Sequence, residues 1–187
     1  MTSLSFLLQY ITRPRTVGAI LPSSKYLAAK MVKNIDFENA ACIAEYGPGT
    51  GVFTQEILRK RSPGTLVLLF EKNEIFCRLL EEKYGKNPNL HIINDSAENI
   101  GRYLSSHNLT HVDCIISGLP FASIPQEVSE NILAQTKCHL KPGGLFVTFQ
   151  YTLFKKDFLM RFFPKIEIAR EIRNIPPAYV FCCRMGM

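Results

Sequence analysis

The 187-residue sequence lacks any apolar run close to the roughly 18 residues that a helix needs to cross a bilayer. Its one N-terminal apolar stretch, Leu4–Ile11, is interrupted by Ser5 and Gln9 and is followed by no small-residue cleavage site, which excludes a typical secretory signal. No repeat, low-complexity segment or linker divides the chain, whose length fits about one domain. We therefore expect one compact unit that stays in the cytoplasm.

The six cysteines include no C-x-x-C pair, so their spacing does not favour a zinc site or a redox motif. We expect no metal and no disulfide framework, and we interpret these residues as reduced thiols, mostly buried. Cys182 and Cys183 are neighbours in an expected strand, so their side chains should point to opposite faces of the sheet.

Acidic residues are absent from the first 33 positions, which carry five basic residues and a charge of +5. Residues 151–187 hold seven basic and three acidic residues, a charge of +4. Residues 34–150 hold ten basic and thirteen acidic residues, a charge of −3, so that the three segments together give the net charge of +6. Basic ends of this kind suit a nucleic acid, an anionic membrane or a plain solvated surface. Charge alone does not decide among the three.

Short apolar runs rich in β-branched residues alternate with longer amphipathic stretches, which is typical of crossover units on a parallel sheet. The expected strands are 41–46, 65–70, 90–93, 112–117 and 145–151, and the expected helices are 50–60, 74–84, 97–105 and 126–139. Residues 141–144, Lys-Pro-Gly-Gly, should stop the last of these helices before the fifth strand. Residues 165–173 and 178–184 should form a hairpin, so that the last strand runs antiparallel to the rest.

Two helices are expected before the first strand. Leu4, Leu7, Leu8 and Ile11 share one helical face, with Arg13 and Arg15 close behind them. Such a helix suits the surface of an anionic membrane, although it could also pack on the sheet. The second helix should begin near Ser23 or Ser24, which provide a capping side chain.

The most specific motif is Glu45-Tyr-Gly47-Pro-Gly49-Thr-Gly51, directly after the first expected strand. It is not the dinucleotide fingerprint G-x-G-x-x-G, because Val52 stands at the position of the third glycine. It resembles motif I of the class I S-adenosylmethionine-dependent methyltransferases. That resemblance implies that Glu45 and the three glycines hold the methionine end of the cofactor.

Acidic residues also follow the second and third expected strands. Glu71 comes 20 residues after Gly51, which is the spacing at which nucleotide-binding folds place a carboxylate for the ribose hydroxyls. By resemblance, Asp95 would accept from the adenine amino group and the N–H of Ser96 or Ala97 would meet a ring nitrogen. Asp95 could also cap the helix that follows, and the two roles are compatible. Ser117, at the end of the fourth strand, completes the expected cofactor set.

Residues 117–121 read Ser-Gly-Leu-Pro-Phe and resemble the substrate motif of amino-directed methyltransferases. The ribosomal RNA adenine dimethylases have Asn-Leu-Pro-Tyr/Phe here, with the asparagine at the position of Gly118. We expect Gly118, Leu119, Pro120 and Phe121 to bind the substrate through backbone carbonyls and apolar walls. Because glycine has no side-chain acceptor, the motif favours a nitrogen other than an aromatic amine.

Over residues 4–184, the sequence is similar to the small bacterial phospholipid N-methyltransferases. The similarity rests on residues 17–24, 45–51, 117–121, Pro125 and 174–178. It implies a Rossmann-like α/β fold with a seven-stranded, mainly parallel sheet. Residues 1–33 would form capping and membrane-binding helices, and residues 34–187 the methyltransferase domain.

The same resemblance implies a monomer on the inner face of the cytoplasmic membrane that transfers methyl groups from S-adenosylmethionine to phosphatidylethanolamine, with no nucleic-acid partner. Three alternatives stay open: a ribosomal RNA adenine N6-methyltransferase, a methyltransferase of a small molecule or a protein, and a non-catalytic relic that binds membranes. No general base is evident. Tyr26, Tyr151, His91 and His139 qualify by residue type alone.

Overall fold

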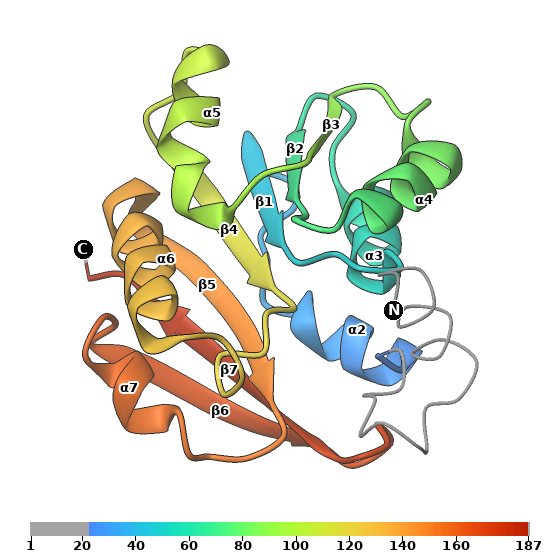
Figure 1. Ribbon diagram of the computed structural model, residues 1–187. Coiled ribbons are helices and arrows are strands. Elements are labelled where there is room, and N and C mark those ends of the chain that lie inside the picture. The colour runs from blue at the N-terminus through green and yellow to red at the C-terminus, as the bar shows by residue number, and fades with distance from the viewer. Residues whose placement is uncertain (1–22, 187) are drawn as a thin grey trace.

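The computed structural model describes residues 23–186, which form one seven-stranded sheet with helices on both faces (Figure 1). The strands are β1 (Cys42–Tyr46), β2 (Leu66–Phe70), β3 (Leu90–Ile93), β4 (Val112–Ser117), β5 (Leu140–Gln150), β6 (Lys165–Glu171) and β7 (Ala178–Arg184). Their spatial order is β3-β2-β1-β4-β5-β7-β6. Strands β1 to β5 pair in parallel, and β7 pairs antiparallel with both β5 and β6. The predicted Rossmann-like sheet with an antiparallel last strand is confirmed.

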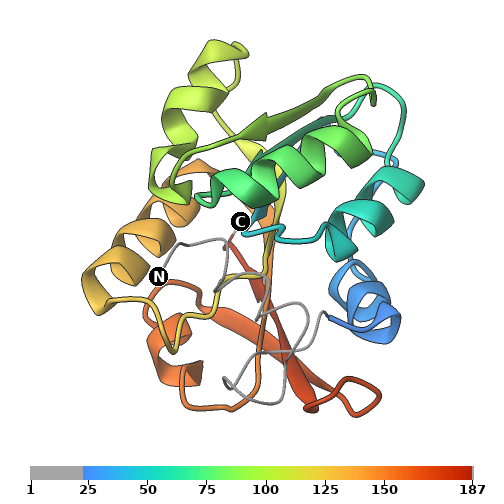
Figure 2. The ribbon, with the colours of Figure 1, turned by 45° about the vertical axis from the view of Figure 1, so that its right-hand side comes forward.

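Helices cover both faces of this sheet (Figure 2), and an apolar core lies between the sheet and the helices on each face. One core is covered by α2 (Lys25–Met31), α3 (Val52–Lys60) and α4 (Glu74–Tyr84). The other is covered by the 3-10 helix η1 (Ala97–Asn99), α5 (Ile100–Ser106), α6 (Gln126–His139) and α7 (Lys156–Met160). Cys182 and Cys183 lie in different cores, as their adjacent strand positions predict. All six thiols are free, and Cys138 is the exposed one.

The residue before the first turn explains where two helices start. The Ser24 side chain accepts from the Leu27 N–H at 3.2 Å, so α2 starts where the sequence indicates. α3 starts after Gly51, which takes a left-handed φ of 82°.

No helix within residues 23–186 is long and apolar enough to span a membrane.

Three elements differ from the sequence-based expectation. The helix expected over 97–105 begins with a separate 3-10 turn, η1, in which the Ser96 side chain accepts a hydrogen bond from the Glu98 N–H. Residues 141–144 lie inside β5, which begins at Leu140. Val112 pairs with Leu140 and Cys114 pairs with Leu145, so the extra residues form a bulge with Gly143 at φ 71°. The five residues of α7 are too few to give a periodic signal.

The predicted membrane helix lies outside the described residues, as do the first positions of the 1–33 segment. The assignments affected are Leu4, Leu7, Leu8, Ile11, Arg13 and Arg15. They stay predictions. The later part of that segment, α2, contributes Leu27, Ala28 and Met31 to the core shared with α3 and α4.

Candidate functional site

The parallel register brings the carboxyl ends of β1 to β4 to one edge of the sheet. The last residues of these strands and the loops that follow them hold all of the sequence-predicted cofactor and substrate positions, in residues 45–51, 71, 95–97 and 117–121. β1 lies between β2 and β4, where the strand order reverses. Ligands of open α/β sheets bind in the crevice outside this reversal point.

The glycine loop is packed on both sides but open at its centre. Gly47, Gly49 and Gly51 have φ values of 63°, 55° and 82°, which ordinary residues adopt only with strain. A Cβ on Gly47 would lie 2.8 Å from the Leu119 side chain, and one on Gly51 would lie 2.6 Å from the Tyr84 ring. A Cβ on Gly49 would meet none of the residues 23–186 within 4 Å. The main chain at Gly49 is therefore accessible to a ligand.

Glu71 connects the end of β2 to this loop. One carboxylate oxygen accepts from the Gly49 N–H at 3.1 Å and the other accepts from the Asn73 N–H at 2.8 Å. The side chain is 9% exposed, and burial raises the pKa of its carboxyl. Glu71 thus fixes the position of Gly49 and leaves lone pairs at the edge where the sequence predicts a ribose.

Glu45 is fully buried at the end of β1. Its Oε2 accepts from the Thr54 hydroxyl at 2.7 Å, whereas its Oε1 has no hydrogen-bond partner among the described residues. Burial raises the pKa of this carboxyl to about 8. A buried acceptor without a donor is unfavourable, so a ligand that brings an N–H to Oε1 gains binding free energy. Thr54, on the first turns of α3, carried no signal in the sequence.

Asp95 organises the turn after β3. One carboxylate oxygen accepts from the Ser96 N–H at 2.7 Å and from the Asn99 amide at 2.9 Å, and the other accepts from the Tyr103 hydroxyl at 2.9 Å. The Asn99 bond, followed by the Ser96 bond, lowers the pKa of Asp95. The residue that caps η1 is Ser96, which is buried together with Ala97. Asp95 therefore keeps its charge and supports this turn.

The substrate loop contacts the glycine loop through main-chain atoms. The Gly118 N–H donates to the Tyr46 carbonyl at 2.8 Å, and a Cβ on Gly118 would lie only 2.7 Å from the Gly47 carbonyl oxygen. The buried Ser117 hydroxyl accepts from the Leu119 N–H at 3.2 Å. Gln150, at the end of β5, donates to the Leu119 carbonyl at 3.3 Å. Gln150 is a contributor that the sequence pattern did not indicate.

Phe121 occupies a different environment from its neighbours in the loop. Its ring is fully buried and packs edge-on against Phe146, with 6.4 Å between centroids, whereas Pro120 is exposed. The ring is therefore part of the core and offers no open wall to a substrate. A substrate-binding role at position 121 stays a prediction for its main chain.

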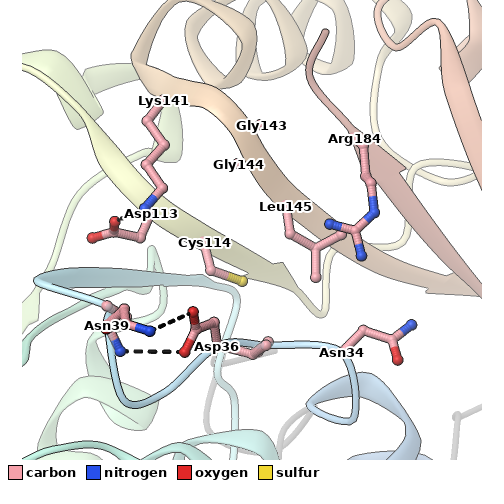
Figure 3. A pocket seen from close by; sticks show the side chains of 12 residues that line it. Asn34, Asp36, Asn39, Asp113, Cys114, Lys141, Gly143, Gly144, Leu145 and Arg184 are labelled. Carbon is pink, nitrogen blue, oxygen red and sulfur yellow. Dashed lines mark hydrogen bonds and ion pairs between the residues drawn. The ribbon is translucent and has the colours of Figure 1, made fainter. Parts of the chain in front are cut away.

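A hollow of about 280 Å³ lies at the opposite edge of the sheet (Figure 3). Four of its polar side chains form two pairs: Lys141 pairs with Asp113, and Asn39 donates to Asp36 at 2.9 Å. Asp113 also accepts from two backbone N–H groups at the start of β1. None of the sequence-predicted site residues within 23–186 lines this hollow, which we interpret as a polar cluster that joins β1, β4 and β5.

The strand order, the glycine loop at its reversal point and the carboxylates at the ends of β1 and β2 define a class I S-adenosylmethionine-dependent methyltransferase, and S-adenosylmethionine is its cofactor. Residues 19–160 match the model of the ribosomal RNA adenine dimethylase family, and the chain belongs to that family.

Two relatives point to different substrates. The chain is 30% identical to an ornithine lipid N-methyltransferase of Singulisphaera acidiphila, over 96% of this chain and 94% of that protein. It is 28% identical to a ribosomal RNA small subunit methyltransferase A of Borreliella burgdorferi, over 55% of this chain and 34% of that protein. The chain thus spans about a third of the ribosomal enzyme but nearly all of the lipid enzyme.

Solved structures show the same fold at low sequence identity. A precorrin-6y C5,15-methyltransferase from Geobacter metallireducens aligns with a TM-score of 0.66 at 15% identity, over 84% of this chain and 88% of that chain. A 16S rRNA methyltransferase from Thermus thermophilus, solved in complex with AdoMet and guanosine, aligns with a TM-score of 0.66 at 16% identity, over 91% of this chain and 45% of that chain. At these identities, the similarity shows that the fold is shared and says nothing of the substrate.

Proposed function

We propose that this methyltransferase transfers methyl groups from S-adenosylmethionine to the primary amine of a membrane lipid. The observation that carries the proposal is the position of the Gly47 carbonyl oxygen, which would lie only 2.7 Å from a Cβ at position 118. Because of this position, the substrate loop has no room for the side-chain acceptor that the adenine dimethylases carry. The similarity to a lipid N-methyltransferase along almost the whole chain supports the same substrate class.

Two lipid headgroups fit the proposal. The sequence motifs favour phosphatidylethanolamine, and the Singulisphaera relative favours an ornithine lipid. Both present an amine to the protein, so the motif in residues 117–121 does not separate them. A second candidate, methylation of adenine in ribosomal RNA, is favoured by the family match over residues 19–160.

The residues at the carboxyl edge fit the cofactor. Glu45 Oε1 is a buried acceptor that lacks a donor within residues 23–186, and an ammonium group of the cofactor's methionine end would supply one. The open main chain at Gly49 would lie along that end, Glu71 would accept from the ribose hydroxyls, and Asp95, Ser96 and Ala97 would face the adenine. The bound cofactor supplies a methyl group already activated by the sulfonium.

The protein must then provide alignment and a site without bulk water. A lipid ammonium resembles that of lysine, with a pKa of about 10.4, so its deprotonation at pH 7 costs roughly 4–5 kcal/mol. Apolar surroundings and the sulfonium charge lower that cost. Among the four side chains that qualify as a base by residue type, Tyr151 is the one that follows β5 at the site edge. We assign no base.

A labelling experiment separates the substrate classes. The protein is incubated with methyl-labelled S-adenosylmethionine and, in parallel, with phosphatidylethanolamine vesicles, ornithine-lipid vesicles and ribosomal RNA. We expect label in one or both lipids and none in RNA. Label in RNA adenine with unlabelled lipids would refute the interpretation of Gly118 and establish the ribosomal activity.

Glu71→Ala tests the cofactor assignment. It removes the acceptor of the Gly49 N–H and the expected acceptor of the ribose, so S-adenosylmethionine should bind more weakly by about 1–3 kcal/mol. Isothermal calorimetry on the folded variant measures the change. Glu82→Ala, which removes the same charge from an exposed position on α4, is the control and should bind normally. Equal affinities for the two variants would show that Glu71 does not bind the cofactor.

A further inference from the structure

Large apolar side chains are exposed in two loops that are distant in sequence. In the loop between β5 and α7, Leu153 is 45% exposed and Phe154 is 82% exposed. In the turn between β6 and β7, Ile172 is 68% exposed and Ile175 is 71% exposed. We call residues 151–156 and 172–177 together the edge surface. Isolated exposed apolar residues are ordinary, but several at one end of a molecule indicate an interaction surface.

The strand register places both loops at one end of the sheet. Gln150 at the end of β5 pairs with Tyr179, and Glu171 at the end of β6 pairs with Ala178. The chain therefore leaves β5 and turns from β6 to β7 at the same edge, which is also the carboxyl edge of β1 and β4. Both loops lie toward the lower end of the molecule in Figures 1 and 2. The edge surface thus adjoins the end of the sheet that carries the glycine and substrate loops.

The turn from β6 to β7 is held in place by α2. The Ser24 N–H donates to the Asn174 side chain at 2.9 Å, and the Lys30 ammonium lies 3.1 Å from the Glu171 carboxylate. The Arg173 guanidinium lies over the Tyr26 ring, 4.3 Å from its centroid. Ile172 and Ile175 are therefore exposed on a turn whose backbone is fixed, and an interface here needs little further ordering of the turn.

The charges around these apolar side chains are mainly positive. Lys155 and Lys156 follow Phe154, and Arg170 and Arg173 flank Glu171. Glu171 itself is buried and paired with Lys30 and Arg173, so it adds no exposed negative charge. Asp157, on α7, is the nearest exposed acid in the sequence. Exposed apolar groups among cations match the headgroup boundary of an anionic bilayer.

We infer that the edge surface docks on an anionic lipid bilayer and presents the carboxyl edge of the sheet to it. The inference deepens the proposed function, on which it rests for the identity of the partner. A second copy of this chain fits less well, because two cationic edges repel each other. RNA fits less well, because three of the four exposed apolar side chains, Leu153, Ile172 and Ile175, are aliphatic and cannot stack on bases as the Phe154 ring can.

Vesicle binding by the full-length chain tests the inference. Phosphatidylcholine vesicles with and without phosphatidylglycerol are titrated to the lipid concentration at which half of the wild-type protein sediments. The variant carries Phe154→Ser, Ile172→Ser and Ile175→Ser, and should bind the anionic vesicles at least about tenfold more weakly, because three apolar side chains no longer enter the boundary. The control carries Leu79→Ser and Ile168→Ser, which are each 37% exposed outside the edge surface, and should bind like wild type.

A charge variant tests the electrostatic part. Lys155→Glu with Lys156→Glu should abolish most of the preference for anionic vesicles, and calorimetry with S-adenosylmethionine should give wild-type affinity for this and the serine variant. Wild-type vesicle binding by the serine variant, or an equal loss in its control, would overturn the inference. Vesicle binding is measured without catalysis, so a protein that binds vesicles through this surface but labels only RNA would contradict the proposed function and leave the docking surface supported.

Discussion

Gly118→Ala should weaken S-adenosylmethionine binding at least about tenfold, or 1.4 kcal/mol, although it adds a single methyl group. The new Cβ would lie 2.7 Å from the Gly47 carbonyl oxygen, a main-chain atom that no rotamer change can move. Relief requires the glycine loop and the substrate loop to separate. That movement disturbs the open main chain at Gly49 and its bond from Glu71. Overpacking of this kind should also cost about 1–3 kcal/mol of folding stability.

Gly64→Ala is the matched control for this prediction. Gly64 lies in the exposed connection between α3 and β2, and no described residue would lie within 4 Å of a Cβ there. Calorimetry with the cofactor and urea denaturation would be run on both variants. Wild-type affinity in Gly118→Ala would show that the two loops can separate freely, and the steric argument against an adenine substrate would then fail. Gly118→Asn, which supplies the missing acceptor, should bind the cofactor no better than Gly118→Ala and should not label RNA.

The positions of the candidate site followed from the sequence because they depend on local pattern. A glycine loop after an apolar strand and an acid at each strand end are readable without coordinates, since parallel strands bring their carboxyl ends together. The helix bounds 74–84 and 126–139 and the antiparallel β7 were also predictable, from periodicity and from the hairpin signal. These features need information from only a few neighbouring residues.

The contacts that define the chemistry of the site did not follow from the sequence. Thr54 bonds Glu45 across nine residues, Gln150 reaches Leu119 across 31, and Gly118 meets Gly47 across 71. No short-range pattern specifies such pairs, which arise from how helices and loops pack on the sheet. The burial of Phe121 shows the same limit, because its aromatic type suggested a substrate wall, whereas its position in the fold places it in the core.

The roles of individual basic residues near the edge surface also became clear only from the fold. From the sequence, the basic C-terminal region fitted nucleic acid, membrane or solvent equally well. The fold separates these roles for individual residues: Arg173 and Lys30 neutralise the buried Glu171, whereas Lys155 and Lys156 lie beside the exposed Phe154. Net charge alone could not make that distinction.

Relative to the wild type, the Glu45→Gln variant should become more stable and should bind the cofactor more weakly as the pH rises. The pKa of Glu45 is about 8 in the folded protein against about 4.5 for an ordinary glutamate, chiefly because of burial. The folded state therefore binds more protons than the unfolded state between these values, and the wild type loses stability across this window as pH rises, by at most about 1.4 kcal/mol per pH unit. Glutamine resembles the protonated acid and can still accept from Thr54. The variant should match the wild type near pH 5 and be the more stable protein at pH 8.

Cofactor affinity should show the reverse trend. If an ammonium of S-adenosylmethionine pairs with Glu45 Oε1, binding requires the carboxylate, and the cost of deprotonating it falls as the pH approaches 8. The ratio of wild-type to Glu45→Gln affinity should therefore rise at least about tenfold between pH 6 and pH 8, by the same 1.4 kcal/mol per unit. The amino group of the cofactor titrates equally in both measurements, so the ratio cancels its contribution. Denaturation and calorimetry over this pH range test both trends. A constant affinity ratio together with the expected stability difference would show that Glu45 is buried for packing alone and that the cofactor's ammonium binds elsewhere.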